Sequence, residues 1–95
     1  MINLGYDISN IGTIYLIESI ELICNNSNYI KMMSNLDKYI YPSIANKYNS
    51  NKLTVKSNIA KATNNMYKTN SNNTIKFKIT PKTIIYYVVE KIKYE

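Results

Sequence analysis

Apolar residues recur three or four positions apart over the first quarter of the chain, which is the spacing of one face of an α-helix. These apolar positions are Leu16, Ile17, Ile20, Ile23 and Cys24. Glu18 and Glu21 fall between them, on the side that would face water. The pattern predicts a first amphipathic helix over Thr13–Cys24 and a polar loop at residues 25–28.

A second helix is indicated by the residues Ile30, Met33, Leu36, Lys38 and Ile40. Tyr41 then precedes Pro42. Because proline disfavours helical geometry in the residue before it, this helix should end or kink there. Pro42 suits the first turn of a new or continued helix, which we expect to run through Tyr48.

The segment from Pro42 to Tyr67 has the spacing of a helix-turn-helix. Its marker positions are Ile44, Ala45, Tyr48, Asn49, Val55 and Ile59. The small Ala45 permits close approach of the second helix, Tyr48 is expected to pack between the two helices, and Asn49 stands where the turn needs a left-handed residue. The same spacing also fits an ordinary helical hairpin with a solvated outer face.

The second helix of this motif combines a buried stripe with a polar face. The stripe, at positions i, i+4, i+7 and i+11, consists of Val55, Ile59, Ala62 and Met66. Opposite it lie Ser57, Lys61, Asn64 and Lys68, and Lys56 lies to one side. The major groove of DNA accepts such a face, because asparagine pairs with adenine edges and lysine with guanine edges.

After a polar loop at residues 68–73, apolar and basic residues alternate with the period of a half-buried strand. The apolar positions are Ile75, Phe77 and Ile79, and the basic ones are Lys76 and Lys78. A basic strand after such a helix resembles the wing of winged helix-turn-helix proteins, which contacts the DNA backbone. It would pair with Ile2–Ile8 in the same subunit or with its own copy in a second subunit.

Thr80 and Pro81 predict the start of a last helix. Its inward stripe is expected to be Ile84, Ile85, Val88 and Ile92. The tyrosines expected to be partly exposed are Tyr86, Tyr87 and Tyr94. They are candidates for a homodimer interface, and closing the monomer core is the alternative.

The net charge of +6 is distributed unevenly along the chain. Residues 1–37 carry one lysine against four carboxylates, a net charge of −3, whereas residues 38–95 carry eleven lysines against two, a net charge of +9. Between Lys47 and Lys82 there are eight lysines and no acidic residue. This is the pattern of a surface that binds a polyanion, although a lysine-rich composition can also simply solvate a protein surface.

The composition excludes several classes of site. Cys24 is the single cysteine and histidine is absent, so neither an internal disulfide nor an ordinary metal site is expected. No apolar run approaches the ~18 residues of a membrane span, and residues 1–10 do not resemble a signal peptide, so we expect a cytoplasmic protein. The carboxylates form no recognisable acid–base pair and there is no phosphate loop, so we expect no enzyme, cofactor or small-molecule substrate.

The most distinctive stretch is Ile40-Tyr41-Pro42-Ser43-Ile44-Ala45-Asn46-Lys47-Tyr48-Asn49, supported by residues 4–5, 14–20, 55, 59–62 and, weakly, 78–92. Together these stretches resemble the C-terminal DNA-binding domain of the stage-zero sporulation protein A family. The resemblance covers most of the chain. It implies an all-helical transcription-factor module whose helix at Leu53–Tyr67 lies in the major groove.

Three departures from the family limit what this resemblance implies. The groove-facing acidic and arginine residues of the family fall on Lys56 and Ser57, and a further arginine falls on Ala60, so the base preference should differ. The family domain is normally joined to a phosphorylated receiver domain; this sequence shows none, which leaves dimerisation and cofactor proteins as the alternatives for control. The family also has an additional helix where this chain has only residues 68–80.

We therefore predict one mainly α-helical domain over residues 1–95, built on a helix-turn-helix, with the basic strand as a candidate wing. The expected function is sequence-specific binding of double-stranded DNA by a homodimeric transcriptional regulator. The alternatives are a plasmid or phage accessory protein acting at an origin of transfer or replication, and a protein-interaction module that has lost DNA binding. The predicted DNA contacts are Lys47, Ser50, Lys52, Thr54, Lys56, Ser57, Lys61, Asn64, Lys68, Lys76 and Lys78.

Overall fold

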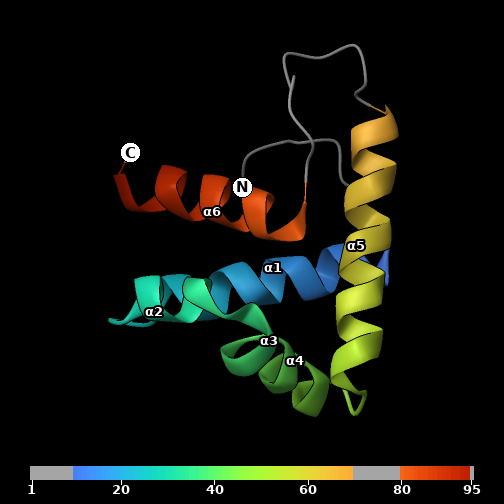
Figure 1. Cartoon of the computed structure of the whole chain (residues 1–95), viewed down its shortest axis with the longest axis horizontal. Coiled ribbons are helices and arrows are strands. Elements are labelled where there is room, and N and C mark those ends of the chain that lie inside the picture. The colour runs from blue at the N-terminus through green and yellow to red at the C-terminus, as the bar shows by residue number, and fades with distance from the viewer. Residues whose placement is uncertain (1–9, 70–79, 95) are drawn as a thin grey trace.

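The computed structural model describes residues 10–69 and 80–94, and for residues 67–69 it describes the backbone only. Within these ranges every regular element is an α-helix (Figure 1). The helices are α1 (Ile11–Cys24), α2 (Tyr29–Ser34), α3 (Leu36–Tyr39), α4 (Tyr41–Lys47), α5 (Lys52–Thr69) and α6 (Pro81–Tyr94). The predicted strand Ile75–Ile79 and its candidate partner Ile2–Ile8 lie outside the described residues.

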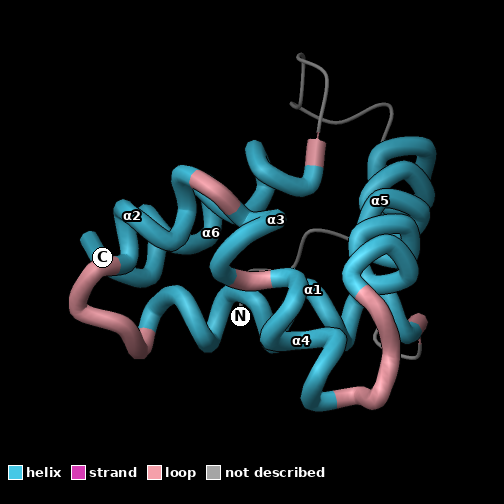
Figure 2. The backbone as a smooth tube through the Cα atoms, turned by 60° about the horizontal axis from the view of Figure 1, so that its bottom comes forward, coloured by secondary structure: helices cyan, strands magenta, loops and turns pink. Residues whose placement is uncertain are grey.

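Helix α1 is the centre of the arrangement, because it packs against α2, α4, α5 and α6. Helices α1 and α6 lie side by side, and α5 stands across their ends (Figure 1). Only short loops separate α2, α3 and α4 (Figure 2); α2 and α4 pack on α1, and α3 packs on both of them. The mainly α-helical fold predicted from the periodicity is confirmed.

Helix α1 forms where the apolar spacing predicts it, beginning two residues earlier than expected. Asn10 caps it, since its Oδ1 accepts a hydrogen bond from the backbone N–H of Gly12 at 2.8 Å. Leu16, Ile20 and Ile23 are buried in the core, as the pattern predicts. The amphipathic spacing therefore identifies the central helix of the fold.

The single helix predicted across residues 30–40 is wrong, because the chain breaks at Asn35 into α2 and α3. Asn35 has an extended backbone, with φ −148° and ψ 85°. Its Oδ1 accepts a hydrogen bond from the N–H of Lys38 at 3.2 Å and so caps the new helix. An asparagine side chain that bonds its own local backbone competes with helix continuation, which explains the break. The interruption predicted at Tyr41–Pro42 is present one residue earlier, at Ile40, and Tyr41 itself begins α4 with Pro42 in its first turn.

Helix α6 starts at Pro81, where Thr80 Oγ1 accepts a hydrogen bond from the N–H of Thr83 at 3.2 Å. Its predicted stripe holds for Ile84, Ile85 and Val88, and Val89 is buried beside them. Ile92 was expected inside but is 50% exposed. The reason is that α1 ends beside this part of α6. Lys93 Nζ donates a hydrogen bond to the carbonyl oxygen of Cys24, the last residue of α1, at 2.9 Å.

Candidate nucleic-acid interface

The turn between α4 and α5 depends on a left-handed residue. Asn49 has φ 53°, a conformation that asparagine tolerates better than most residues. The chain reverses tightly there, because the N–H of Ser50 donates to the carbonyl oxygen of Ala45 at 2.8 Å. This bond closes the end of α4 and satisfies one of its terminal carbonyl groups. The role predicted for Asn49 is confirmed.

Helix α5 has its own cap, which sequence reasoning missed. Asn51 Oδ1 accepts a hydrogen bond from the N–H of Thr54 at 2.9 Å, and the Asn51 carbonyl accepts one from Val55 at 3.1 Å. The signal was available in the sequence, since an asparagine one residue before a helix is a preferred cap. The cap fixes the point at which α5 begins and therefore which side chains its first turn exposes.

The inner face of α5 is the predicted apolar stripe. All four of its members are buried: Val55, Ile59, Ala62 and Met66. Helices α1 and α5 come unusually close where they cross. A Cβ atom added to Gly12 would meet the backbone carbonyl oxygen of Asn58, and it would lie 2.7 Å from that carbonyl carbon and 3.0 Å from the Cβ of Ala62. Only glycine fits this crossing, which sets the position of α5 on α1.

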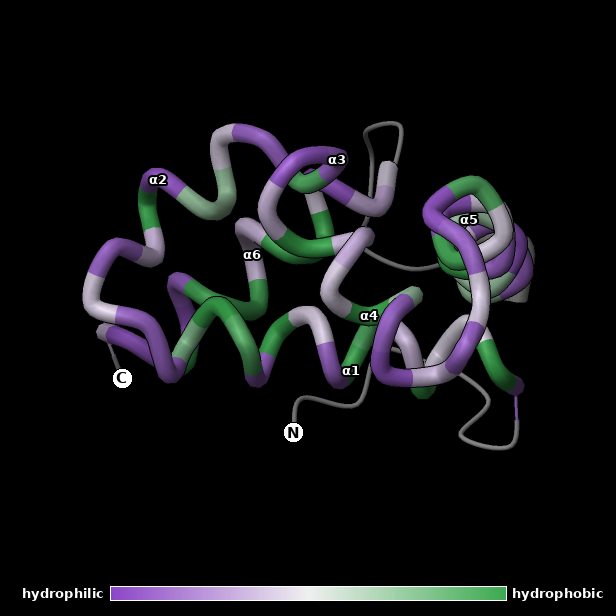
Figure 3. Tube along the Cα trace, turned by 90° about the horizontal axis from the view of Figure 1, so that it is seen from below, coloured by the Kyte–Doolittle hydropathy of each residue, from purple (hydrophilic) through white to green (hydrophobic). Residues whose placement is uncertain are grey.

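The outer face of α5 is polar and basic. Its exposed side chains include Lys52, Thr54, Lys56, Ser57, Lys61 and Asn64. Figure 3, in which α5 is seen nearly end-on, shows mostly hydrophilic residues along its outer side. Ser50 is half-buried in the turn beside this face. Of the other predicted contacts, the side chain of Lys68 and the whole of Lys76 and Lys78 lie outside the described residues.

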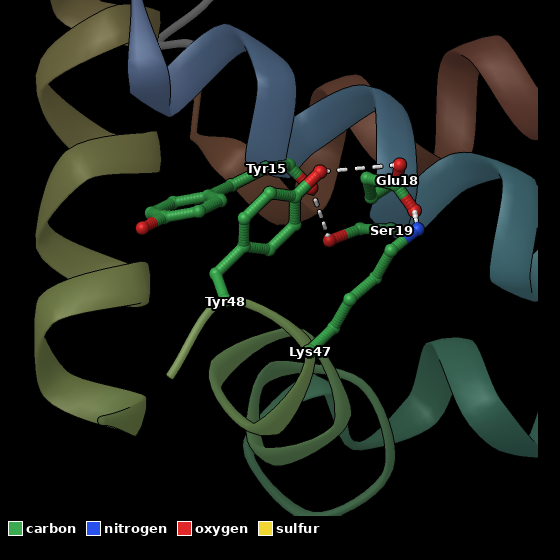
Figure 4. Close-up of polar contacts among 5 residues, drawn as sticks. All are labelled: Tyr15, Glu18, Ser19, Lys47 and Tyr48. Carbon is green, nitrogen blue, oxygen red and sulfur yellow. Dashed lines mark hydrogen bonds and ion pairs between the residues drawn. The ribbon is translucent and has the colours of Figure 1, made fainter. Parts of the chain in front are cut away.

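One predicted DNA contact, Lys47, belongs to a cluster that fastens the turn to α1 (Figure 4). Lys47 Nζ lies 2.7 Å from Glu18 Oε2, and the Tyr48 hydroxyl donates to Glu18 Oε1 at 3.2 Å. The rings of Tyr48 and Tyr15 meet edge to face, with centroids 5.2 Å apart. Tyr48 was expected to pack between the two helices of the motif; its ring lies instead against α1.

The ion pair in this cluster changes the titration of both groups. The hydrogen bond from Lys47 lowers the pKa of Glu18 below its ordinary value of 4.5. The same bond raises the pKa of Lys47. Because the folded protein favours the ionised form of Glu18, the pair contributes stability at neutral pH, and this contribution disappears as the pH falls through the lowered pKa.

Glu18→Gln should therefore flatten the acid branch of the stability curve. Between about pH 6 and about pH 3 we expect the free energy of unfolding of this variant to fall less than that of the original protein, since glutamine has no proton to bind. Urea unfolding at a series of pH values measures the difference. Glu21→Gln, on the exposed side of the same helix, is the control. Parallel curves for the original protein and Glu18→Gln would contradict the assigned ion pair.

A second predicted contact, Lys56, is also paired with a carboxylate. Its Nζ lies 3.3 Å from Asp37 Oδ2 of α3, and both side chains are about half exposed. Burial raises the pKa of the neighbouring Tyr41 hydroxyl to about 12, and the carboxylate of Asp37 adds to this increase. Exposed pairs of this kind contribute only about 0–1 kcal/mol to stability. Sequence reasoning missed both pairs, because their partners lie on other helices.

Over residues 10–69 and 80–94 no cluster of His, Cys, Asp and Glu side chains is arranged to hold a metal ion. In the same part of the chain, no helix has the length and apolar character needed to cross a membrane.

These elements define a helix-turn-helix domain. A short helix is followed by a tight turn with a left-handed asparagine, and then by a longer helix that has a buried apolar stripe and an exposed basic face. The family model described as the sporulation initiation factor Spo0A C terminal matches residues 1–91, and the chain belongs to this family. The C-terminal domain of Spo0A is the DNA-binding domain of a transcription regulator. No curated protein sequence matches the chain.

Proposed function

We propose that this protein binds double-stranded DNA sequence-specifically through its helix-turn-helix and regulates transcription, with α5 in the major groove. The observation that carries the proposal is the two-sided character of α5: its apolar stripe is buried, whereas its opposite face is polar, basic and exposed. The N-terminal part of a recognition helix contacts base edges in this class of protein. Membership of the Spo0A C-terminal family supports the same function.

Different residues would contact the DNA bases and the DNA backbone. Ser57, Lys61 and Asn64 occupy the outer face of α5, where they would meet base edges. Lys47 and Lys52 lie at the two sides of the turn and would contact phosphates. The flanking residues that we assign to the same interface are Ser50, Thr54, Lys56, Lys68, Lys76 and Lys78.

We also propose that two copies act together on DNA. A single helix-turn-helix reads few base pairs, and such proteins commonly bind two half-sites about one helical turn apart. Helix α6 supports this proposal, since Tyr87, Ile92 and Tyr94 are exposed on it. The C-terminal third of the chain is therefore our candidate for the contact between copies.

Alanine variants on α5 and in the turn test the proposed function. A preferred site is first selected from random duplex DNA with the purified protein. Ser57→Ala, Lys61→Ala or Asn64→Ala should then reduce discrimination between this site and altered sites by about 1–3 kcal/mol at any position that makes a good base contact. Lys47→Ala and Lys52→Ala should weaken binding to all sequences about equally. Fluorescence anisotropy on matched duplexes measures both effects.

Two results would contradict this assignment. If the selection enriches no DNA, the protein does not bind DNA specifically. If the Ser57, Lys61 and Asn64 variants lose affinity equally for every sequence, α5 does not read bases in the major groove.

A further inference from the structure

Leu53 is the most exposed large apolar side chain among the described residues, at 72%. It lies in the first turn of α5, directly after Lys52 and two residues after the cap at Asn51. The apolar residues that follow it on this helix, Val55 and Ile59, are fully buried. Leu53 therefore does not belong to the stripe that holds α5 to the rest of the protein.

The position of Leu53 places it on the face proposed to contact DNA. Residues three and four apart are neighbours on a helix surface, so Leu53 adjoins Lys56 and Ser57. Helical side chains lean toward the N-terminus, so Leu53 extends this face toward the start of the helix. It is an apolar side chain at the leading end of a polar, basic face.

The chemistry of the major groove suggests what such a side chain would contact. Base edges in this groove present hydrogen-bond donors and acceptors, and thymine adds an apolar C5-methyl group. A leucine makes no hydrogen bond, so its favourable contact there is with that methyl group. The first turn of a recognition helix is also the part that commonly reaches base edges.

We propose that Leu53 is a specificity-determining residue that reads a thymine methyl group in the major groove. The inference rests on the proposed function, because it requires α5 to lie in that groove. It adds a direct preference for thymine at one position of each half-site, next to the bases that Ser57 is proposed to contact.

Replacing thymine by uracil tests this contact, because it removes only the C5-methyl group. In the selected site, each thymine is replaced in turn by deoxyuridine, and affinities are measured for the original protein and for Leu53→Ala. We expect the original protein to lose about fourfold in affinity at one position per half-site, the effect of one methyl-sized group taken out of a buried contact. Leu53→Ala should bind the thymine site more weakly and show no further loss with uracil.

Ile30→Ala is the matched control, because Ile30 is 65% exposed but lies on α2. This variant should respond to uracil as the original protein does. Far-ultraviolet circular dichroism checks that Leu53→Ala keeps its helices.

The outcomes separate this inference from the proposed function. If DNA is selected but uracil never weakens binding, or if Leu53→Ala responds to uracil as the original protein does, the role of Leu53 is overturned and the proposed function stands. If no DNA is selected, the proposed function is overturned and the role of Leu53 with it.

Discussion

Raising the salt concentration from about 50 to about 200 mM should lower the affinity for DNA on the order of 10³-fold for each bound subunit. Each lysine that neutralises a phosphate releases bound counterions and adds about −0.9 to the slope of log affinity against log salt. The slope should reflect about six contacts per subunit. The lysines that we expect to make them are Lys47, Lys52, Lys56, Lys61, Lys76 and Lys78.

Variants in which one lysine is replaced show how much each position contributes to this slope. Lys52→Ala should reduce its magnitude by about one unit for each bound subunit. Lys31→Ala is the control, because Lys31 is exposed on α2, outside the acid-free stretch that begins at Lys47. Affinity titrations at five or more salt concentrations measure both slopes. A flat response of the original protein would favour a protein-interaction module that does not bind DNA.

Replacing Gly12 by alanine should destabilise the protein by about 1–3 kcal/mol. In most helix interiors the same change stabilises by about 1 kcal/mol, because alanine is the better helix former. Here the new Cβ would meet the carbonyl group of Asn58. Backbone atoms have no alternative rotamer, so α5 would have to move away from α1 and leave its apolar stripe less well packed. The sign of the effect is therefore opposite to the usual one.

Thermal and urea unfolding measure this change. A loss of about 1 kcal/mol lowers the melting temperature of a domain of this size by roughly 4–8 °C. Glu21→Ala, an exposed substitution on the same helix, should stay within about 0.5 kcal/mol of the original protein. A Gly12→Ala protein that is more stable than the original would show that the two helices do not cross so closely.

Local patterns predicted much of the fold, because the forces behind them act over one or two helical turns. The stripe from Val55 to Met66 follows from helical periodicity, and the turn at Asn49 follows from the backbone freedom of asparagine. The break at Asn35 was missed because a mid-helix asparagine is compatible with either outcome until its side chain finds a backbone donor. The exposure of Ile92 depends on where α1 ends, which periodicity within α6 cannot report.

The candidate site was predictable in outline but not in its contacts. The basic outer face of α5 follows from the same periodicity as the stripe. The pairing of Lys47 with Glu18 and of Lys56 with Asp37 depends on tertiary contact between helices, so no local pattern indicates it. Leu53 was missed for a different reason: an apolar residue is normally assigned to the core, whereas in the folded chain this side chain is exposed on the outer face.

The attachment of the helix-turn-helix to α1 also determines the orientation of α5. The two meet at separate points, at the glycine crossing near the start of α1 and at the Glu18 cluster farther along it. A helix attached at a single point can rotate about that point, whereas attachment at a second point prevents the rotation. Helix α1 therefore fixes the angle of α5 as well as its distance, so a change in the tilt of α1 would also turn the polar, basic face of α5.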